Sequence, residues 1–209
     1  LEPYRGFPTM MRTLPLLLKA RKDIKVVMVG GDGISYGAPP TDAPNWRERM
    51  LREVGDQIDL DRVVFPGRIP YNIYVSMMQR SDAHVYLTYP FVASWSLRES
   101  MAFGCATIGS DTDPVREFIV DGDNGLLTSF FDRQALADKV LELLENKSLN
   151  TILRAGDPYT PGPNGAVSHS GELGSGRATV LPSASCLWAA IIAVTCSAVY
   201  VTPPRPVYE

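Results

Sequence analysis

The run Lys25-Val26-Val27-Met28-Val29 is short and apolar, and it stops at Gly30-Gly31. An apolar run without polar alternation is typical of a parallel strand that is buried on both faces of its sheet. A helical pattern over residues 7–21 precedes the run, and a polar amphipathic helix is predicted over 45–54 after a loop. The stretch therefore predicts a parallel strand with a helix on either side of it in the chain.

The same alternation continues toward the C-terminus. Four further short strands are predicted, at 63–65, 83–87, 107–109 and 125–127. Helices are predicted over 71–79, 94–103 and 132–145, whereas 115–120 is ambiguous. This order predicts an α/β fold, a Rossmann-like parallel sheet with helices on both faces. Ligands of such sheets bind at the carboxyl ends of the strands, so the loops there are the candidate site.

Composition changes near residue 146, because only seven of the 43 charged side chains lie in 147–209. The sequence therefore predicts a domain over 1–146 and an irregular tail over 147–209, rich in Pro, Gly and Ser and then apolar. The apolar run 186–201 is compatible with a membrane anchor or with buried or aggregating strands. We favour a disordered or non-native extension, because helical periodicity stops after Leu144.

Charge and cysteine content argue against several classes of protein. The net charge of −3 without a basic stripe argues against nucleic-acid binding. The three cysteines lack Cys-x-x-Cys spacing, which makes a zinc site or a disulfide framework improbable. A reducing cytoplasm is the simplest compartment, with peripheral membrane contact left open by the tail.

The segment Ser94-Trp95-Ser96-Leu97-Arg98-Glu99 opens a predicted helix just after a strand. A helix N-terminus offers free N–H groups to a diphosphate, and Glu99 could accept hydrogen bonds from a ribose diol. The spacing Ser96-x-x-Glu99 is also that of a capping box, so both interpretations stay open.

Three other motifs are weaker. Gly30-Gly31 alone indicates a sharp turn, since the spacing of a dinucleotide or P-loop motif is missing. Arg5, beside a glycine before a helix, could meet phosphate oxygens or be a solvated charge. Asp111 and Asp113 could hold a metal ion, but they fit a turn better.

Taken together, ordered segments of residues 1–146 resemble the C-terminal, donor-binding domain of family 4 glycosyltransferases, which have the two-domain GT-B architecture. The segments that carry the resemblance are Glu2-Pro3-Tyr4-Arg5-Gly6, Val27-Met28-Val29-Gly30-Gly31-Asp32, Val64-Phe65-Pro66-Gly67-Arg68-Ile69-Pro70, Tyr86-Leu87-Thr88-Tyr89-Pro90, Ser96-Leu97-Arg98-Glu99-Ser100-Met101-Ala102-Phe103-Gly104 and Asp121-Gly122-Asp123-Asn124-Gly125-Leu126-Leu127.

The resemblance implies a donor site, without a metal ion, for a nucleotide diphosphate sugar. Arg5 would meet the pyrophosphate, the backbone at Arg68 and Ile69 would border the base, and Glu99 would bind the ribose. The amides near Ser96 would take phosphate. The remaining donor-site positions are Gly31 and Leu97. The family's first glutamate of the E-x7-E motif, which addresses the donor sugar, falls on Phe91.

The implied activity is retaining transfer of a sugar from the nucleotide sugar to an unknown acceptor, with no cofactor. In the family a first strand and an N-terminal acceptor domain precede the segment that begins at Leu1, so the chain is expected to be N-terminally truncated. Weak or no transfer by this chain alone is the expectation. The alternatives are a non-catalytic nucleotide-binding module, an inactive fragment, and a nucleotide-sugar epimerase.

Overall fold

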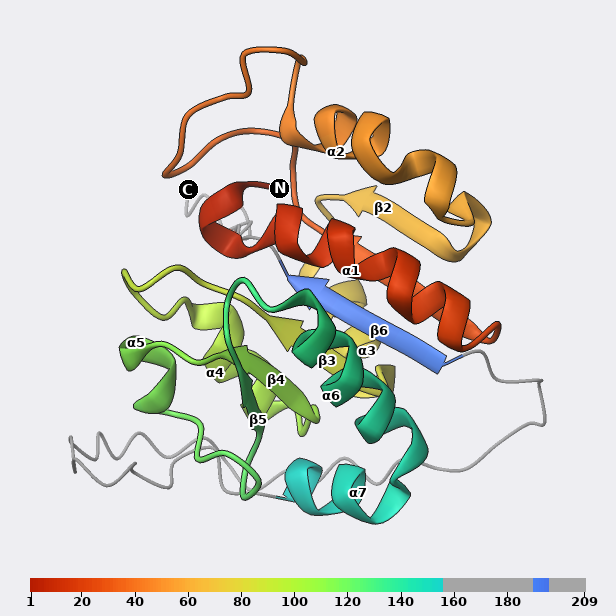
Figure 1. Cartoon of the computed structure of the whole chain (residues 1–209). Helices are drawn as coiled ribbons and strands as arrows, with labels where there is room; N and C mark the ends of the chain where they lie inside the picture. Colours follow the sequence, from red (N-terminus) through yellow and green to blue (C-terminus); the bar gives the residue numbers. More distant parts are fainter. Residues whose placement is uncertain (156–189, 196–209) are drawn as a thin grey trace, which may run out of the picture.

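The computed structural model describes residues 1–155 and 190–195. Within them, six parallel strands form one sheet in the order β2-β1-β6-β3-β4-β5 (Figure 1). The strands are β1 (Ile24–Val29), β2 (Val63–Gly67), β3 (Ala83–Tyr86), β4 (Thr107–Ser110), β5 (Leu126–Thr128) and β6 (Ala190–Thr195).

Helices connect successive strands from β1 to β5, as the alternating pattern predicts. The connecting helices are α2 (Trp46–Val54), η2 (Gly55–Gln57), η3 (Leu60–Arg62), α3 (Tyr71–Arg80), α4 (Trp95–Ala102) and α5 (Asp113–Arg116). The helices η1 (Pro3–Arg5) and α1 (Phe7–Ala20) precede β1, and α6 (Arg133–Glu145) and α7 (Lys147–Ala155) follow β5. The Rossmann-like fold class is confirmed. The predicted helices and strands of residues 1–146 agree with the structure to within a residue or two at their ends, and the ambiguous segment contributes to the single turn of α5.

The core lies between the sheet and the helices on its two faces. In Figure 1, α1 and α6 lie in front of the sheet and α3 lies behind it. Apolar side chains of α1 and α6 pack with β1 and β3 in the main cluster; its fully buried members include Phe7, Leu14, Met28, Val85 and Val140. Because the strands are parallel, the carboxyl ends of β1, β2 and β3 lie at one edge of the sheet.

Two parts of the predicted tail belong to the fold. Residues 147–155 form α7, in which Leu153 is buried and Arg154 donates hydrogen bonds to the carbonyls of Ser81 and Gly104. The spacing of Leu149, Ile152 and Leu153 is that of an apolar helix face, although the low charge of residues 147–209 is typical of a tail. The helical part thus extends beyond the boundary expected at residue 146.

The second part is β6, which lies within the apolar run 186–201. Its backbone pairs on one side with β1, from Ile24 opposite Ala190 to Val29 opposite Thr195. On the other side it pairs with β3. A strand inside this run is one of the interpretations that the sequence left open, and the structure places it at the centre of the sheet. The expectations for 156–189 and 196–209, including disorder, lie outside the described residues.

Candidate functional site

The candidate site lies at the carboxyl edge of the sheet. Arg5 comes from η1, Gly31 follows β1, Arg68 and Ile69 follow β2, and Ser96, Leu97 and Glu99 lie on α4 after β3. In Figure 1 the N-terminus lies at the end of the sheet toward which the β6 arrow points. The fold therefore brings the predicted donor-site residues to one edge, although they are far apart in the sequence.

Arg5 is a buried positive charge at this edge, and only 6% of it is exposed. Its Nη1 donates to Thr88 Oγ1 at 2.8 Å, to the Val92 carbonyl at 3.1 Å and to Tyr86 Oη at 3.4 Å. These three bonds use only Nη1, and the described residues supply no hydrogen-bond partner to Nη2 or Nε. A buried guanidinium with donors to spare is suited to an anionic ligand.

Tyr86 connects Arg5 to the start of α4. Its hydroxyl oxygen also accepts a hydrogen bond from the Ser94 amide at 2.7 Å, so one atom joins the guanidinium to the helix N-terminus. Ser94 is the N-cap of α4, but its side chain makes no capping bond and instead lies 2.6 Å from Ser96 Oγ. The first N–H groups of a helix have no partner within it and lie at the positive end of its dipole. Arg5 and α4 together can therefore hold a diphosphate.

The capping-box interpretation of Ser96 and Glu99 is wrong. Ser96 is the second residue of α4 rather than its N-cap, which places Glu99 too far into the helix to reach the N-cap amide. Ser96 and Leu97 are buried at the first turn of the helix.

Glu99 instead faces α3. Its Oε1 accepts a hydrogen bond of 3.3 Å from the hydroxyl of Tyr71, the first residue of α3. Burial raises the pKa of Glu99 above its ordinary value, and the bond from Tyr71 offsets part of that shift. Sequence reasoning missed Tyr71, because nothing near it in the chain indicates a carboxylate that follows 28 residues later.

Glycines bring the loops after β1 and β2 together. Gly30 N–H donates to the Gly67 carbonyl at 3.0 Å, and Gly67 has a φ of 70°. The sharp turn predicted for Gly30-Gly31 fits the φ of 148° at Gly30. A Cβ at Gly31 would lie 3.3 Å from Nε of Arg68, so Gly31 lets the exposed Arg68 lie across this loop. Ile69 is half-buried beside it.

Glu2 is a second residue that the sequence did not single out. It is fully buried, and its Oε2 accepts hydrogen bonds from the Ser35 and Tyr36 amides at 3.1 and 3.0 Å. These bonds hold the loop after β1 over Arg5, whose guanidinium carbon lies 5.3 Å from the centre of the Tyr36 ring. Phe91, 62% exposed, lies against the same ring.

The motif Asp111-Thr112-Asp113 has a structural role. Both carboxylates pair with Arg116, at 2.6 and 3.5 Å, and Asp113 lies in the first turn of α5. Among residues 1–155 and 190–195, no group of three or more His, Cys, Asp or Glu side chains is placed to hold a metal ion. In the same residues, no helix combines the length and the apolar character needed to cross a bilayer.

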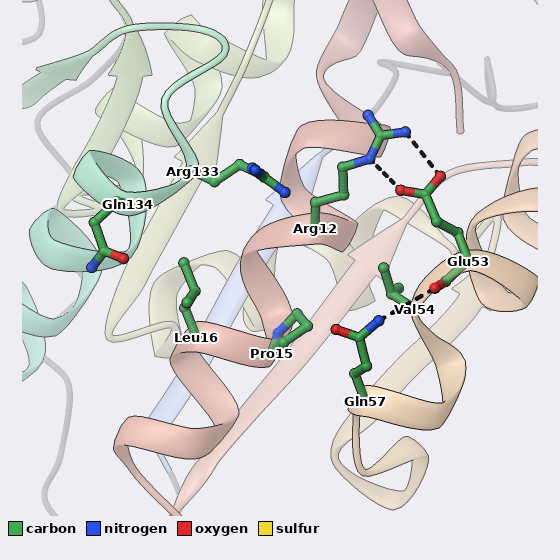
Figure 2. Close-up of a pocket in the computed structure, with 8 residues that line it drawn as sticks. All are labelled: Arg12, Pro15, Leu16, Glu53, Val54, Gln57, Arg133 and Gln134. Carbon is green, nitrogen blue, oxygen red and sulfur yellow. Dashed lines mark hydrogen bonds and ion pairs between the residues drawn. The ribbon is translucent and has the colours of Figure 1, made fainter.

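A hollow of about 380 Å³ lies elsewhere, between α1, α2 and α6 (Figure 2). Figure 2 shows the bidentate ion pair of Arg12 and Glu53 on one side of it and Arg133 on the other. None of the predicted site residues lines this hollow.

Comparisons with known proteins agree with the fold. A crystal structure of the C-terminal domain of a glycosyl transferase group 1 family protein (LpcC) from Francisella tularensis superposes with a TM-score of 0.62 at 24% identity, covering 74% of this chain and 76% of that one. Anabaena HepE in complex with UDP-glucose gives a TM-score of 0.58 at 19% identity, covering 75% of this chain and 40% of HepE. The sheet and helices are thus those of one half of a GT-B fold.

Sequence relatives point the same way. Phosphatidyl-myo-inositol mannosyltransferases of Mycolicibacterium smegmatis and Mycobacterium leprae are each 28% identical over 153 residues, 71% of this chain. The match spans 35% and 36% of their lengths, so this chain covers about a third of these relatives. A profile described as glycosyl transferases group 1 matches residues 1–156, and the chain belongs to that family.

Proposed function

We propose that this chain is the donor-binding half of a retaining family 4 glycosyltransferase that uses a nucleotide diphosphate sugar. The observation that carries the proposal is the link from Arg5 through Tyr86 to the N-terminus of α4. A cation and a helix N-terminus that meet at one hydroxyl oxygen suit a diphosphate. Glu99, on the same helix, is placed to accept hydrogen bonds from the ribose diol. HepE, crystallised with UDP-glucose, lends support to a nucleotide sugar as ligand.

In the proposed reaction the bond between the anomeric carbon and the diphosphate oxygen breaks, and the sugar passes to the acceptor oxygen with retention of configuration. The acceptor oxygen passes its proton to the departing diphosphate as the new bond forms. The departing diphosphate gains negative charge, and Arg5 together with the α4 amides stabilises that charge. Because these groups supply the positive charge, we expect activity without a divalent metal ion.

The acceptor side belongs to a second domain. This chain covers about a third of its mannosyltransferase relatives, and we propose that an N-terminal GT-B domain supplies the acceptor site and closes the cleft. We expect weak or no transfer by this chain alone. Those relatives are named for phosphatidyl-myo-inositol and for mannosyl transfer, which supports action at a membrane surface and a mannosyl group as one candidate for the transferred sugar. We propose a cytoplasmic location as well.

The test is calorimetric titration of the full chain with UDP, GDP and ADP. We expect one nucleotide to bind, and Arg5→Ala and Glu99→Ala each to weaken it roughly 10- to 100-fold, since hydrogen bonds to charged groups contribute about 1.5–3 kcal/mol. Arg12→Ala and Glu53→Ala are matched controls, because this ion pair lies at the hollow away from the site. Equal effects of the two pairs of substitutions would contradict the donor-site assignment.

A second candidate is a non-catalytic nucleotide-binding module, favoured by Phe91 at the position of a sugar-reading glutamate. Sugar transfer by this chain joined to an N-terminal GT-B domain separates the two. Turnover identifies the enzyme, and tight nucleotide binding without turnover identifies the module.

A further inference from the structure

Two exposed aromatic rings meet at the carboxyl edge of the sheet. Tyr36 comes from the loop after β1 and Phe91 from the loop after β3, and they are 52% and 62% exposed. Their ring centroids are 5.4 Å apart, with an interplanar angle of 60°. Much of the apolar surface of both rings stays in water, so a ligand with an apolar face could cover it favourably.

The pair borders the proposed diphosphate site. The Tyr36 ring lies 5.3 Å from the guanidinium carbon of Arg5, and the residue after Phe91, Val92, accepts a hydrogen bond from Arg5 Nη1. Tyr36 is also fixed through its amide, which donates to the buried carboxylate of Glu2 at 3.0 Å. A group attached to a diphosphate at Arg5 would therefore lie next to the two rings.

We propose that Tyr36 and Phe91 form a stacking platform for the glycosyl group of the donor. The inference rests on the proposed function and adds to it the means of holding the sugar. A pyranose presents C–H bonds on its face and hydroxyl groups at its edge, and aromatic rings contact the face. A platform of this kind holds the ring without reading each hydroxyl group, so sugars of different hydroxyl configuration bind with similar affinity.

The nucleobase is the competing occupant of these rings, because bases also stack on aromatic side chains. Glu99, the residue proposed to bind the ribose, faces α3 through its hydrogen bond from Tyr71, whereas the Tyr36–Phe91 pair comes from the loops after β1 and β3. This arrangement places the base and ribose toward α3 and leaves the Tyr36–Phe91 platform to the sugar.

The experiment compares each nucleotide with its sugar conjugate on the full chain. Dissociation constants are measured by calorimetry for UDP and UDP-glucose and for GDP and GDP-mannose. The sugar gain is the dissociation constant of the free nucleotide divided by that of its sugar conjugate. We expect Phe91→Ala and Tyr36→Ala each to lower the sugar gain about three- to tenfold, the range of one aromatic contact. Affinity for the free nucleotide should change less than about twofold in Phe91→Ala, in line with a contact made by the sugar alone.

Two controls isolate the platform. Phe131→Ala removes another phenylalanine that is 70% exposed and packs on Phe130, so it should leave the sugar gain unchanged. Tyr36→Phe keeps the ring and should also leave it unchanged. An unaltered sugar gain in Phe91→Ala and Tyr36→Ala overturns the platform while leaving the donor site intact. Equal weakening of nucleotide and conjugate in Phe91→Ala assigns that ring to the base and also overturns the platform. Failure of the wild-type chain to bind any nucleotide overturns the proposed function itself.

Discussion

Gly6 joins Arg5 to α1, and replacing it with alanine tests whether this position can hold a Cβ next to Leu87. Its φ is 69°, in the left-handed region, where a residue with a Cβ is disfavoured by about 1–2 kcal/mol. A Cβ placed there would also lie 2.3 Å from Cβ and 2.7 Å from Cδ1 of Leu87, which is buried in the core. Overpacking of this kind costs about 1–3 kcal/mol, so Gly6→Ala should lower the free energy of unfolding by about 2–5 kcal/mol.

Gly67→Ala is the matched comparison. Gly67 has nearly the same φ, 70°, but no atom lies within 4 Å of the position its Cβ would take. It should therefore show the backbone penalty alone, about 1–2 kcal/mol. Both variants are measured by urea unfolding followed by circular dichroism.

Equal destabilisation of the chain by the two substitutions would contradict this prediction. In that case Leu87 moves aside without penalty, and the contact does not constrain the junction. Because Leu87 is followed by Thr88, which accepts a hydrogen bond from Arg5, we also expect Gly6→Ala to weaken nucleotide binding in the fraction that stays folded.

Three further predictions follow from other parts of the structure. Nucleotide affinity should fall as the pH drops through the raised pKa of Glu99, whereas the affinity of Glu99→Gln should not change over this pH range. The free energy of unfolding should fall as the pH rises through the same pKa, because the folded state holds the Glu99 proton more tightly than the unfolded state does. Arg62→Met should lower the free energy of unfolding by about 2–4 kcal/mol in urea titrations, because Arg62 donates to the carbonyls of Leu18, Arg21 and Ile24; a loss below about 0.5 kcal/mol would contradict it. Removing 156–209 takes β6 away and should abolish cooperative unfolding, whereas an unchanged transition would show that β6 is not needed.

Hydrophobic patterning was enough to predict β1 to β5 and the helices between them. The reason is that each strand of a buried parallel sheet is a short apolar run, and each covering helix repeats its apolar positions at helical spacing. The position of β6 could not be predicted in this way. Hydrophobic patterning identifies an apolar run but not its partner strands. β6 pairs between β1 and β3, and that position exists only once the other strands have formed the sheet.

Some residues of the candidate site could be predicted from the sequence, and others could not. Arg5, Gly31 and Glu99 lie in segments whose order and spacing are recognisable in the chain, and the structure brings them to one edge. Glu2, Tyr36 and Tyr71 could not be found from the sequence, because each acts through a contact with a residue remote in the chain. Local sequence does not locate the N-cap of α4, because both Ser94 and Ser96 are suitable capping residues; the structure places it at Ser94.

The central position of β6 has a consequence for biosynthesis. β1 begins at residue 24, and its partner strand begins at residue 190. While the polypeptide emerges from the ribosome, β1 and β3 are made long before the strand that separates them, so their facing edges remain open to other chains. Pairing between such distant segments also slows folding. The sheet is then completed by the insertion of a strand into its middle, and the unpaired edges of β1 and β3 are exposed to aggregation until that step.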